Sequence, residues 1–142
     1  MSGPAASERP TGMPVGATPR SVLLVDDHRG FRVVVRSLLD AEPGFEVVGE
    51  ARDGEEAVEL AGRLGPDLVV MDVRLPGITG MEATRRIVGR DPSVVVVLVS
   101  TVRREDLPAD LLGCGAVGFV QKEALDPSAL AELVAGAEGG VG

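Results

Sequence analysis

The stretch SVVVVLVS at residues 93–100 constrains the fold more than any other part of the chain. Between its two serines it holds only valine and leucine, so it lacks the alternation of a strand with one face in water. Such a run predicts a strand that is covered on both faces, as the central strands of parallel sheets are. A chain that contains this strand must therefore supply helices for both sides of its sheet.

The rest of the chain alternates between short apolar runs and amphipathic segments. We expect strands at 21–27, 45–50, 67–73, 93–100 and 117–121, and helices at 31–41, 54–65, 80–89 and 126–140. The last helix should have Asp126 as its N-cap and Pro127 as its first residue. This alternation predicts an α/β fold: a flavodoxin-like five-stranded parallel sheet in the order 2-1-3-4-5, with helices on both faces.

Segment 103–116 is the least regular part of this pattern. A helix is expected between the fourth and fifth strands, but Pro108 falls in the middle of the segment. Either a helix begins there with Pro108 in its first turn, or a longer helix is broken there.

Composition narrows the classes of partner. The formal charge of −8 repels nucleic acid and anionic membranes, and no local basic patch offsets it. No apolar run reaches the roughly 18 residues of a membrane span. Cys114 is the single cysteine and no signal-peptide pattern follows Met1, so we expect a cytoplasmic protein. Residues 1–20 are rich in Pro, Gly, Ser and Thr and predict a disordered tail before one domain at 21–142.

Acidic residues stand at the ends of two strands that this topology makes neighbours. Asp26 and Asp27 end the first strand, and Asp72 ends the third. Ligand sites of such sheets lie at the carboxyl ends of the strands, so three carboxylates should converge there. Their repulsion is relieved by a divalent cation, and oxygen donors suit Mg²⁺ or Mn²⁺ better than Zn²⁺. The adjacent His28 is more often a surface residue than a ligand.

Two further polar groups fall on the same edge. Ser100 and Thr101 end the fourth strand, and Lys122 follows the fifth. A hydroxyl and an ammonium beside a metal and carboxylates suit a phosphoryl group, with Asp72 as its nucleophilic acceptor. Simpler interpretations stay open for each residue taken alone: acids at a helix start, hydroxyls that cap a turn, and a solvated lysine.

Four motifs in this order resemble one family. VDD at 25–27, MDVRLPGITG at 71–80, VS at 99–100 and GFVQK at 118–122 resemble the receiver domain of bacterial two-component response regulators, over residues 21–139. VDDHRGFR and DVRLPG are similar in particular to the NarL-type subgroup. Members of that subgroup usually carry a DNA-binding helix-turn-helix after the receiver.

The resemblance implies a role for each site residue. Asp72 would accept a phosphoryl group from a phosphohistidine of a sensor histidine kinase, with Ser100 and Lys122 completing the catalytic set. Mg²⁺ would be held by the carboxylates of Asp26, Asp27 and Asp72 and by the backbone carbonyl of Arg74. Ser100 and Phe119 would move as the switch. The resemblance thus implies a self-phosphorylating signalling domain rather than a conventional enzyme.

Some residues depart from the family pattern. Glu123 follows Lys122 where many receivers have proline, and Phe119 lacks the hydroxyl of the tyrosine found in many relatives. Two other functions are weighed against the switch. A metal-dependent phosphohydrolase of the haloacid-dehalogenase type needs an aspartate two residues after the nucleophile, where this chain has Arg74. An interaction module that works without phosphorylation would normally lack an acid or the lysine.

The output of such a domain stays open in the sequence. Residues 21–142 make one receiver and leave no room for a DNA-binding domain. The chain is either a single-domain regulator, which we favour slightly, or the N-terminal piece of a longer transcription regulator. A homodimer is compatible with both.

Overall fold

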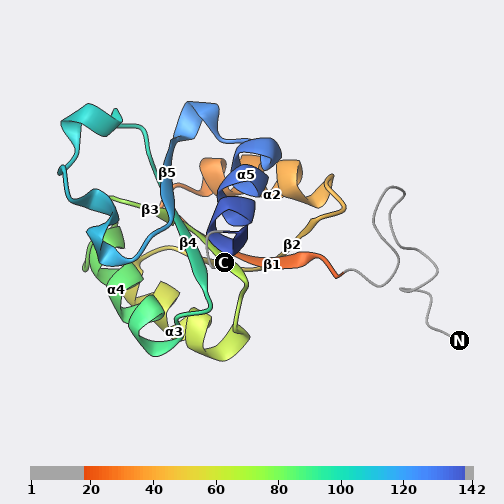
Figure 1. The fold of residues 1–142 in the computed structure, drawn as a ribbon, viewed down its shortest axis with the longest axis horizontal. Helices are drawn as coiled ribbons and strands as arrows, with labels where there is room; N and C mark the ends of the chain where they lie inside the picture. The colour runs from red at the N-terminus through yellow and green to blue at the C-terminus, as the bar shows by residue number, and fades with distance from the viewer. Residues whose placement is uncertain (1–17, 140–142) are drawn as a thin grey trace, which may run out of the picture.

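The computed structural model describes residues 18–139, which form one parallel sheet with helices on both sides (Figure 1). The strand order is β2-β1-β3-β4-β5, so the predicted fold class and order are confirmed. The strands are β1 (Arg20–Val25), β2 (Phe45–Ala51), β3 (Leu68–Asp72), β4 (Val95–Ser100) and β5 (Gly118–Gln121). Most of the expected tail at 1–20 lies outside the described residues, and Arg20 already belongs to β1.

Four α-helices cover the sheet within the described residues. They are α2 (Arg29–Asp40), α3 (Gly54–Leu64), α4 (Gly80–Arg90) and α5 (Pro127–Gly139). Figure 1 shows α2 and α5 together on one face of the sheet, with α3 and α4 on the other. As predicted, α5 begins at Pro127, and its N-cap Asp126 accepts a hydrogen bond from the backbone N–H of Ala129 at 2.8 Å.

Strand β4 shows why its sequence has no alternation. Val96 and Leu98 pack in the apolar cluster beneath α3 and α4, whereas Val97 and Val99 pack in the cluster beneath α2 and α5. All four side chains have no exposed surface. Burial on both faces therefore requires apolar residues at every position of this strand.

The connection between β4 and β5 differs from the expected helix. Segment 103–116 forms two short 3-10 turns, η1 (Arg104–Asp106) and η2 (Leu111–Cys114), and no α-helix. The carbonyls of Pro108 and Ala109 accept hydrogen bonds from the Arg104 guanidinium, at 3.0 and 3.2 Å. Pro108 also has no N–H to donate. No helix starts at Pro108, so that expectation was wrong. The segment is interrupted at Pro108, as the second expectation had it, but the pieces on either side are 3-10 turns and not parts of an α-helix.

Two side chains anchor this connection from within. Leu111 and Cys114 are buried in the cluster beneath α3 and α4, and Gly115 ends η2 with a φ of 110°. Within residues 18–139, no helix is both long enough and apolar enough to cross a membrane.

Candidate functional site

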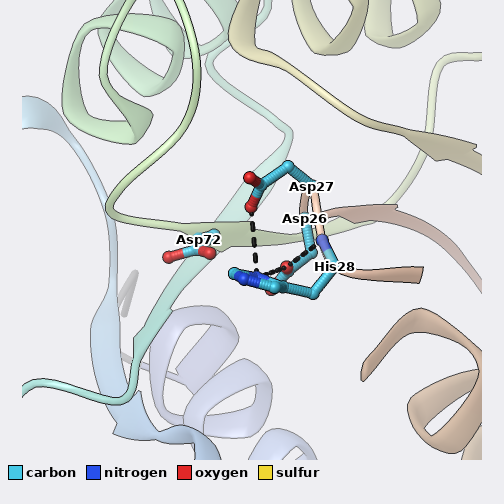
Figure 2. Close-up of side chains that lie close together, drawn as sticks. All are labelled: Asp26, Asp27, His28 and Asp72. Atoms are coloured by element: carbon cyan, nitrogen blue, oxygen red, sulfur yellow. Dashed lines mark hydrogen bonds and ion pairs between the residues drawn. The ribbon is translucent and has the colours of Figure 1, made fainter. Parts of the chain in front are cut away.

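Three carboxylates meet at the carboxyl edge of the sheet, as the sequence analysis expected. Asp26 directly follows β1 and Asp72 is the last residue of β3, and both are buried, whereas Asp27 is exposed. One possible ligand atom from each of Asp26, Asp27, His28 and Asp72 lies within 4.8 Å of the others. Figure 2 shows these four side chains gathered around one small space.

The loop after β1 fixes the position of Asp26. Its backbone N–H donates to the carbonyl of Ala51 on β2 at 3.0 Å, and its Oδ1 accepts from the backbone N–H of His28 at 2.8 Å. Its Oδ2 is fully buried and takes no hydrogen bond of regular geometry, although the Lys122 ammonium lies 2.5 Å away. We treat that contact as an ion pair, because it does not meet the geometry of a directed hydrogen bond.

Lys122 follows β5 and reaches across the end of the sheet. Its Nζ lies 3.2 Å from Oδ2 of Asp72 and 4.4 Å from the centre of the Phe31 ring, a cation–π distance. Burial alone would lower the pKa of Lys122, but the carboxylates of Asp26 and Asp72 outweigh it and raise the pKa. Lys122 therefore carries its positive charge at neutral pH.

Asp72 is tolerated at the end of a buried strand because two donors face it. Its Oδ1 accepts from the backbone N–H of Arg74 at 3.0 Å, and its Oδ2 faces Lys122. Burial, together with the charge of Asp26, raises the pKa of Asp72, and the bonds from Arg74 and Lys122 offset only part of that rise. A buried carboxylate with a raised pKa beside a second carboxylate is a setting that a cation stabilises.

The donor set fits a small divalent cation. Ligand atoms on opposite sides of a magnesium ion lie about 4.2 Å apart, twice the usual Mg²⁺–O distance, so atoms spread over at most 4.8 Å are close to that spacing. The buried Oδ2 of Asp26 takes no regular hydrogen bond, and its ion pair with Lys122 is the contact that a bound cation would share or replace. Carboxylate and carbonyl oxygens are the ligands that Mg²⁺ prefers.

His28 is a surface residue that also touches the acids. Its side chain is 70% exposed, yet Nδ1 lies 3.1 Å from Oδ1 of Asp26 and 3.2 Å from Oδ1 of Asp27. The sequence favoured a surface position for His28, and its exposure agrees, but nothing in the sequence indicated these contacts.

A cavity of about 810 Å³ opens over Asp72, and Ser100, Thr101 and Lys122 are among the residues that line it. Phe31, at the start of the helix expected over 31–41, lines it as well. The volume leaves ample room for a phosphoryl group above the carboxylate of Asp72.

The two expected switch residues lie differently from each other. Ser100 is buried, and its Oγ accepts a hydrogen bond from the backbone N–H of Val102 at 3.0 Å, so it caps the turn after β4 as well as lining the cavity. Phe119 is half-buried against the apolar cluster beneath α3 and α4 and is not among the lining residues. The structure thus brings Ser100 to the cavity and leaves Phe119 outside it.

The close approach of α4 to the end of β3 completes the site. The backbone N–H of Gly80 donates to the carbonyl of Val73 at 2.9 Å, and a Cβ on Gly80 would overlap the carbonyl oxygen of Asp72. Only glycine leaves room for this contact. This contact holds the start of α4 against the end of β3, beside Asp72.

The chain belongs to the response regulator receiver domain family, whose family model matches residues 22–135. The transcriptional regulatory protein DegU of Brevibacillus brevis is 42% identical over 113 residues, which cover 80% of this chain and 48% of DegU. The similarity of this chain to NarL-type regulators agrees with the resemblance seen in the sequence. The chain spans about half the length of the curated relatives it matches.

Solved structures show the same fold. The receiver domain of a NarL-type regulator from Mycobacterium tuberculosis is 29% identical with a TM-score of 0.78, and the match covers 84% of this chain and 99% of that one. A chain in the CheX–CheY–BeF₃–Mg²⁺ complex from Borrelia burgdorferi is 30% identical with a TM-score of 0.70, over 84% of this chain and 89% of that one.

Proposed function

We propose that Asp72 accepts a phosphoryl group from the phosphohistidine of a sensor histidine kinase, and that phosphorylation switches the contacts of this protein. The observation that carries the proposal is the setting of Asp72 beneath the cavity. Its carboxylate lies 3.2 Å from a charged lysine and within a cluster of two further carboxylates suited to Mg²⁺. The B. burgdorferi complex, whose name includes Mg²⁺ and BeF₃, supports the same chemistry in a related fold.

The reaction transfers one phosphoryl group between two protein side chains. An oxygen of Asp72 forms a bond to phosphorus while the bond from phosphorus to the imidazole nitrogen breaks, and that nitrogen keeps the electron pair. Lys122 neutralises charge on the phosphoryl oxygens as a point charge. Asp26, Asp27, Asp72 and the carbonyl of Arg74 would hold Mg²⁺, which supplies further charge neutralisation when bound.

The new phosphoryl group changes the charge balance of the cavity. It adds a charge of about −1.5 to −2 and three strong acceptors. The phosphoryl oxygens compete with Asp26 for the Lys122 ammonium. The hydroxyl proton of Ser100 is available to donate to them, because Oγ of Ser100 accepts, and does not donate, in its bond with the N–H of Val102. A shift of Ser100 would pull on the turn after β4, and Phe119 on neighbouring β5 would move with it.

The switch needs partners as well as a phosphoryl donor. We infer a sensor histidine kinase as donor, Mg²⁺ as cofactor and a cytoplasmic location. Output would pass through protein contacts, including a homodimer, or through a DNA-binding domain outside these residues. The formal charge of −8 argues against direct nucleic-acid binding by this chain.

The test is intact-protein mass spectrometry after incubation with acetyl phosphate and Mg²⁺. Wild type should gain the mass of one phosphoryl group, and both Asp72→Asn and prior addition of EDTA should abolish the gain. No gain, together with an NMR spectrum in beryllium fluoride and Mg²⁺ that is the same as in Mg²⁺ alone, would overturn the proposal in favour of an interaction module that works without phosphate. Steady turnover of a generic phosphate ester would overturn it in favour of a phosphohydrolase.

A further inference from the structure

Arg32 on α2 is a buried charged residue whose contacts the proposed chemistry does not use. It is only 8% exposed, and its guanidinium makes two hydrogen bonds. One nitrogen, Nη1, donates to the backbone carbonyl of Asp26 at 2.5 Å, and Nε donates to Oε1 of Glu50 at 2.8 Å. Burying an arginine is costly unless its donors are satisfied, so these two bonds account for its place in the fold.

The carbonyl that Arg32 holds belongs to the peptide bond between Asp26 and Asp27. That peptide plane joins the two side chains that complete the cation site with Asp72. A peptide bond is planar, so a contact that holds its carbonyl oxygen also restrains the Cα atoms on both sides of it. The N–H of Asp26 is already tied to Ala51, so Arg32 restrains the other side of the same residue.

Glu50 makes this arrangement compatible with a bound cation. Burial would raise the pKa of Glu50, but hydrogen bonds from Arg36 and Arg32 outweigh it and hold the pKa below its ordinary value. Glu50 therefore stays ionised and offsets the charge of Arg32, which would otherwise repel a cation nearby. Arg36 meets the second oxygen of Glu50 at 2.6 Å without contacting Asp26.

We propose that Arg32 is a positioning residue of the cation site, which sets the relative orientation of the Asp26 and Asp27 carboxylates by holding the peptide between them. The proposal rests on the proposed function, because it assumes that these carboxylates bind Mg²⁺. It assigns to Arg32 the role that outer-sphere partners have at metal sites, where they orient the groups that touch the ion.

The test compares Arg32→Met with Arg36→Met in a ¹⁵N–¹H NMR titration with MgCl₂, beside thermal unfolding. Methionine is unbranched like arginine and has a similar helix propensity, but it has no hydrogen-bond donor. Each variant removes one ion pair with Glu50, and only Arg32→Met removes the bond to Asp26. We expect Arg32→Met to weaken Mg²⁺ binding about tenfold, the low end for outer-sphere partners, and Arg36→Met to leave it within about twofold of wild type.

The outcomes separate this inference from the proposed function. Equal Mg²⁺ affinity in wild type and a folded Arg32→Met overturns the inference alone, and so does equal weakening in both variants, which would mark a merely structural role. If wild type binds no Mg²⁺, both proposals fail. If wild type binds Mg²⁺ and is not phosphorylated, only the proposed function fails.

A conservative variant covers the case in which Arg32→Met does not fold. Arg32→Lys keeps the charge, but a single ammonium cannot reproduce the two-pronged contact with Asp26 and Glu50. Its Mg²⁺ affinity should fall between those of wild type and Arg32→Met. An affinity equal to wild type in Arg32→Lys, with Arg32→Met unfolded, would overturn the inference.

Discussion

The Lys122 ammonium lies 2.5 Å from Oδ2 of Asp26, so an ion pair joins the residue after edge strand β5 to the residue after β1. Between these two strands lie β3 and β4, and the ion pair crosses the ends of both. The ammonium holds the same carboxylate that a bound cation would use. A cation bound there would therefore compete with Lys122 for Asp26, and the consequences of that competition can be measured.

Removing the Lys122 charge should tighten cation binding. Two unit charges about 4 Å apart interact by several kcal/mol near a protein surface, and after screening we expect Lys122→Met to raise Mg²⁺ affinity about tenfold. Lys122→Arg, which keeps the charge, should stay near wild type. An NMR titration with MgCl₂ measures both, and equal affinity in wild type and Lys122→Met would contradict the competition.

The same variant should depend more strongly on metal for its stability. Without Lys122 the buried Oδ2 of Asp26 loses its counter-charge, and a buried charge without a partner destabilises a fold. In EDTA we expect the Tm of Lys122→Met to lie below that of wild type. Addition of Mg²⁺ should raise the Tm of Lys122→Met more than it raises the Tm of wild type. Differential scanning calorimetry with and without Mg²⁺ checks this, with Arg90→Met at the C-terminal end of α4 as control.

Phe31 should stabilise the charged lysine through its ring. The ammonium stands 4.4 Å from the ring centre, and such contacts contribute about 0.5–2 kcal/mol depending on exposure. A double-mutant cycle with Phe31→Leu and Lys122→Met, measured by urea unfolding, should give a coupling of about 1 kcal/mol. Additive effects of the two substitutions would show that the ring serves only to fill space.

Asp72 should make stability fall as pH rises in the metal-free protein. The folded protein keeps the Asp72 proton to a higher pH than the unfolded chain does, so between the two pKa values the folded state binds more protons. Stability is lost as pH rises through that window, which begins near pH 4, the ordinary range of an aspartate. Asp72→Asn has no such proton to lose.

In EDTA at pH 7, Asp72→Asn should therefore have a higher Tm than wild type, and the difference should vanish as the pH falls below about 4. Thermal unfolding over this pH range checks the sign. A lower Tm for Asp72→Asn at pH 7 would mean that its hydrogen bonds with Arg74 and Lys122 outweigh its burial.

Two glycines of α4 should respond in opposite directions to the same substitution. Gly80→Ala puts a methyl group against the carbonyl of Asp72, whereas Gly89→Ala meets nothing within 4 Å. We expect Gly89→Ala to stabilise the protein by about 0.5–1 kcal/mol. Gly80→Ala should destabilise it by 1 kcal/mol or more, roughly the scale of overpacking, as judged by urea unfolding. A Gly80→Ala variant as stable as wild type would show that the loop can move away.

Much of the fold was readable from the sequence because its signals are local and repeated. The uninterrupted apolar run of β4 indicated burial on both faces, and the acids at Asp26 and Asp72 fell on strands that the topology makes neighbours. The carboxyl ends of parallel strands share one edge, so strand order alone brought these residues together.

Other features depend on contacts that no local pattern records. The Arg104 side chain donates to the carbonyls of Pro108 and Ala109, in the segment where two 3-10 turns stand in place of the expected helix. Arg32 sits in the amphipathic pattern of α2 as an ordinary polar residue, and only the packed structure shows it beneath the Asp26 carbonyl. The contact of Phe31 with Lys122 could not be predicted, because the spacing of an aromatic residue along a helix does not distinguish a position in the core from one beside the cavity.

The two 3-10 turns between β4 and β5 also bear on how readily the protein can change shape. An α-helix resists rearrangement because its hydrogen bonds form and break as a cooperative set. This connection has only a few separate bonds, each of which can open alone, and many of its residues are exposed. Its amide hydrogens should exchange with solvent before those of α3 or α5. In the proposed switch, a movement of Ser100 would pass directly into this connection, and shifting the connection requires no α-helix to unwind.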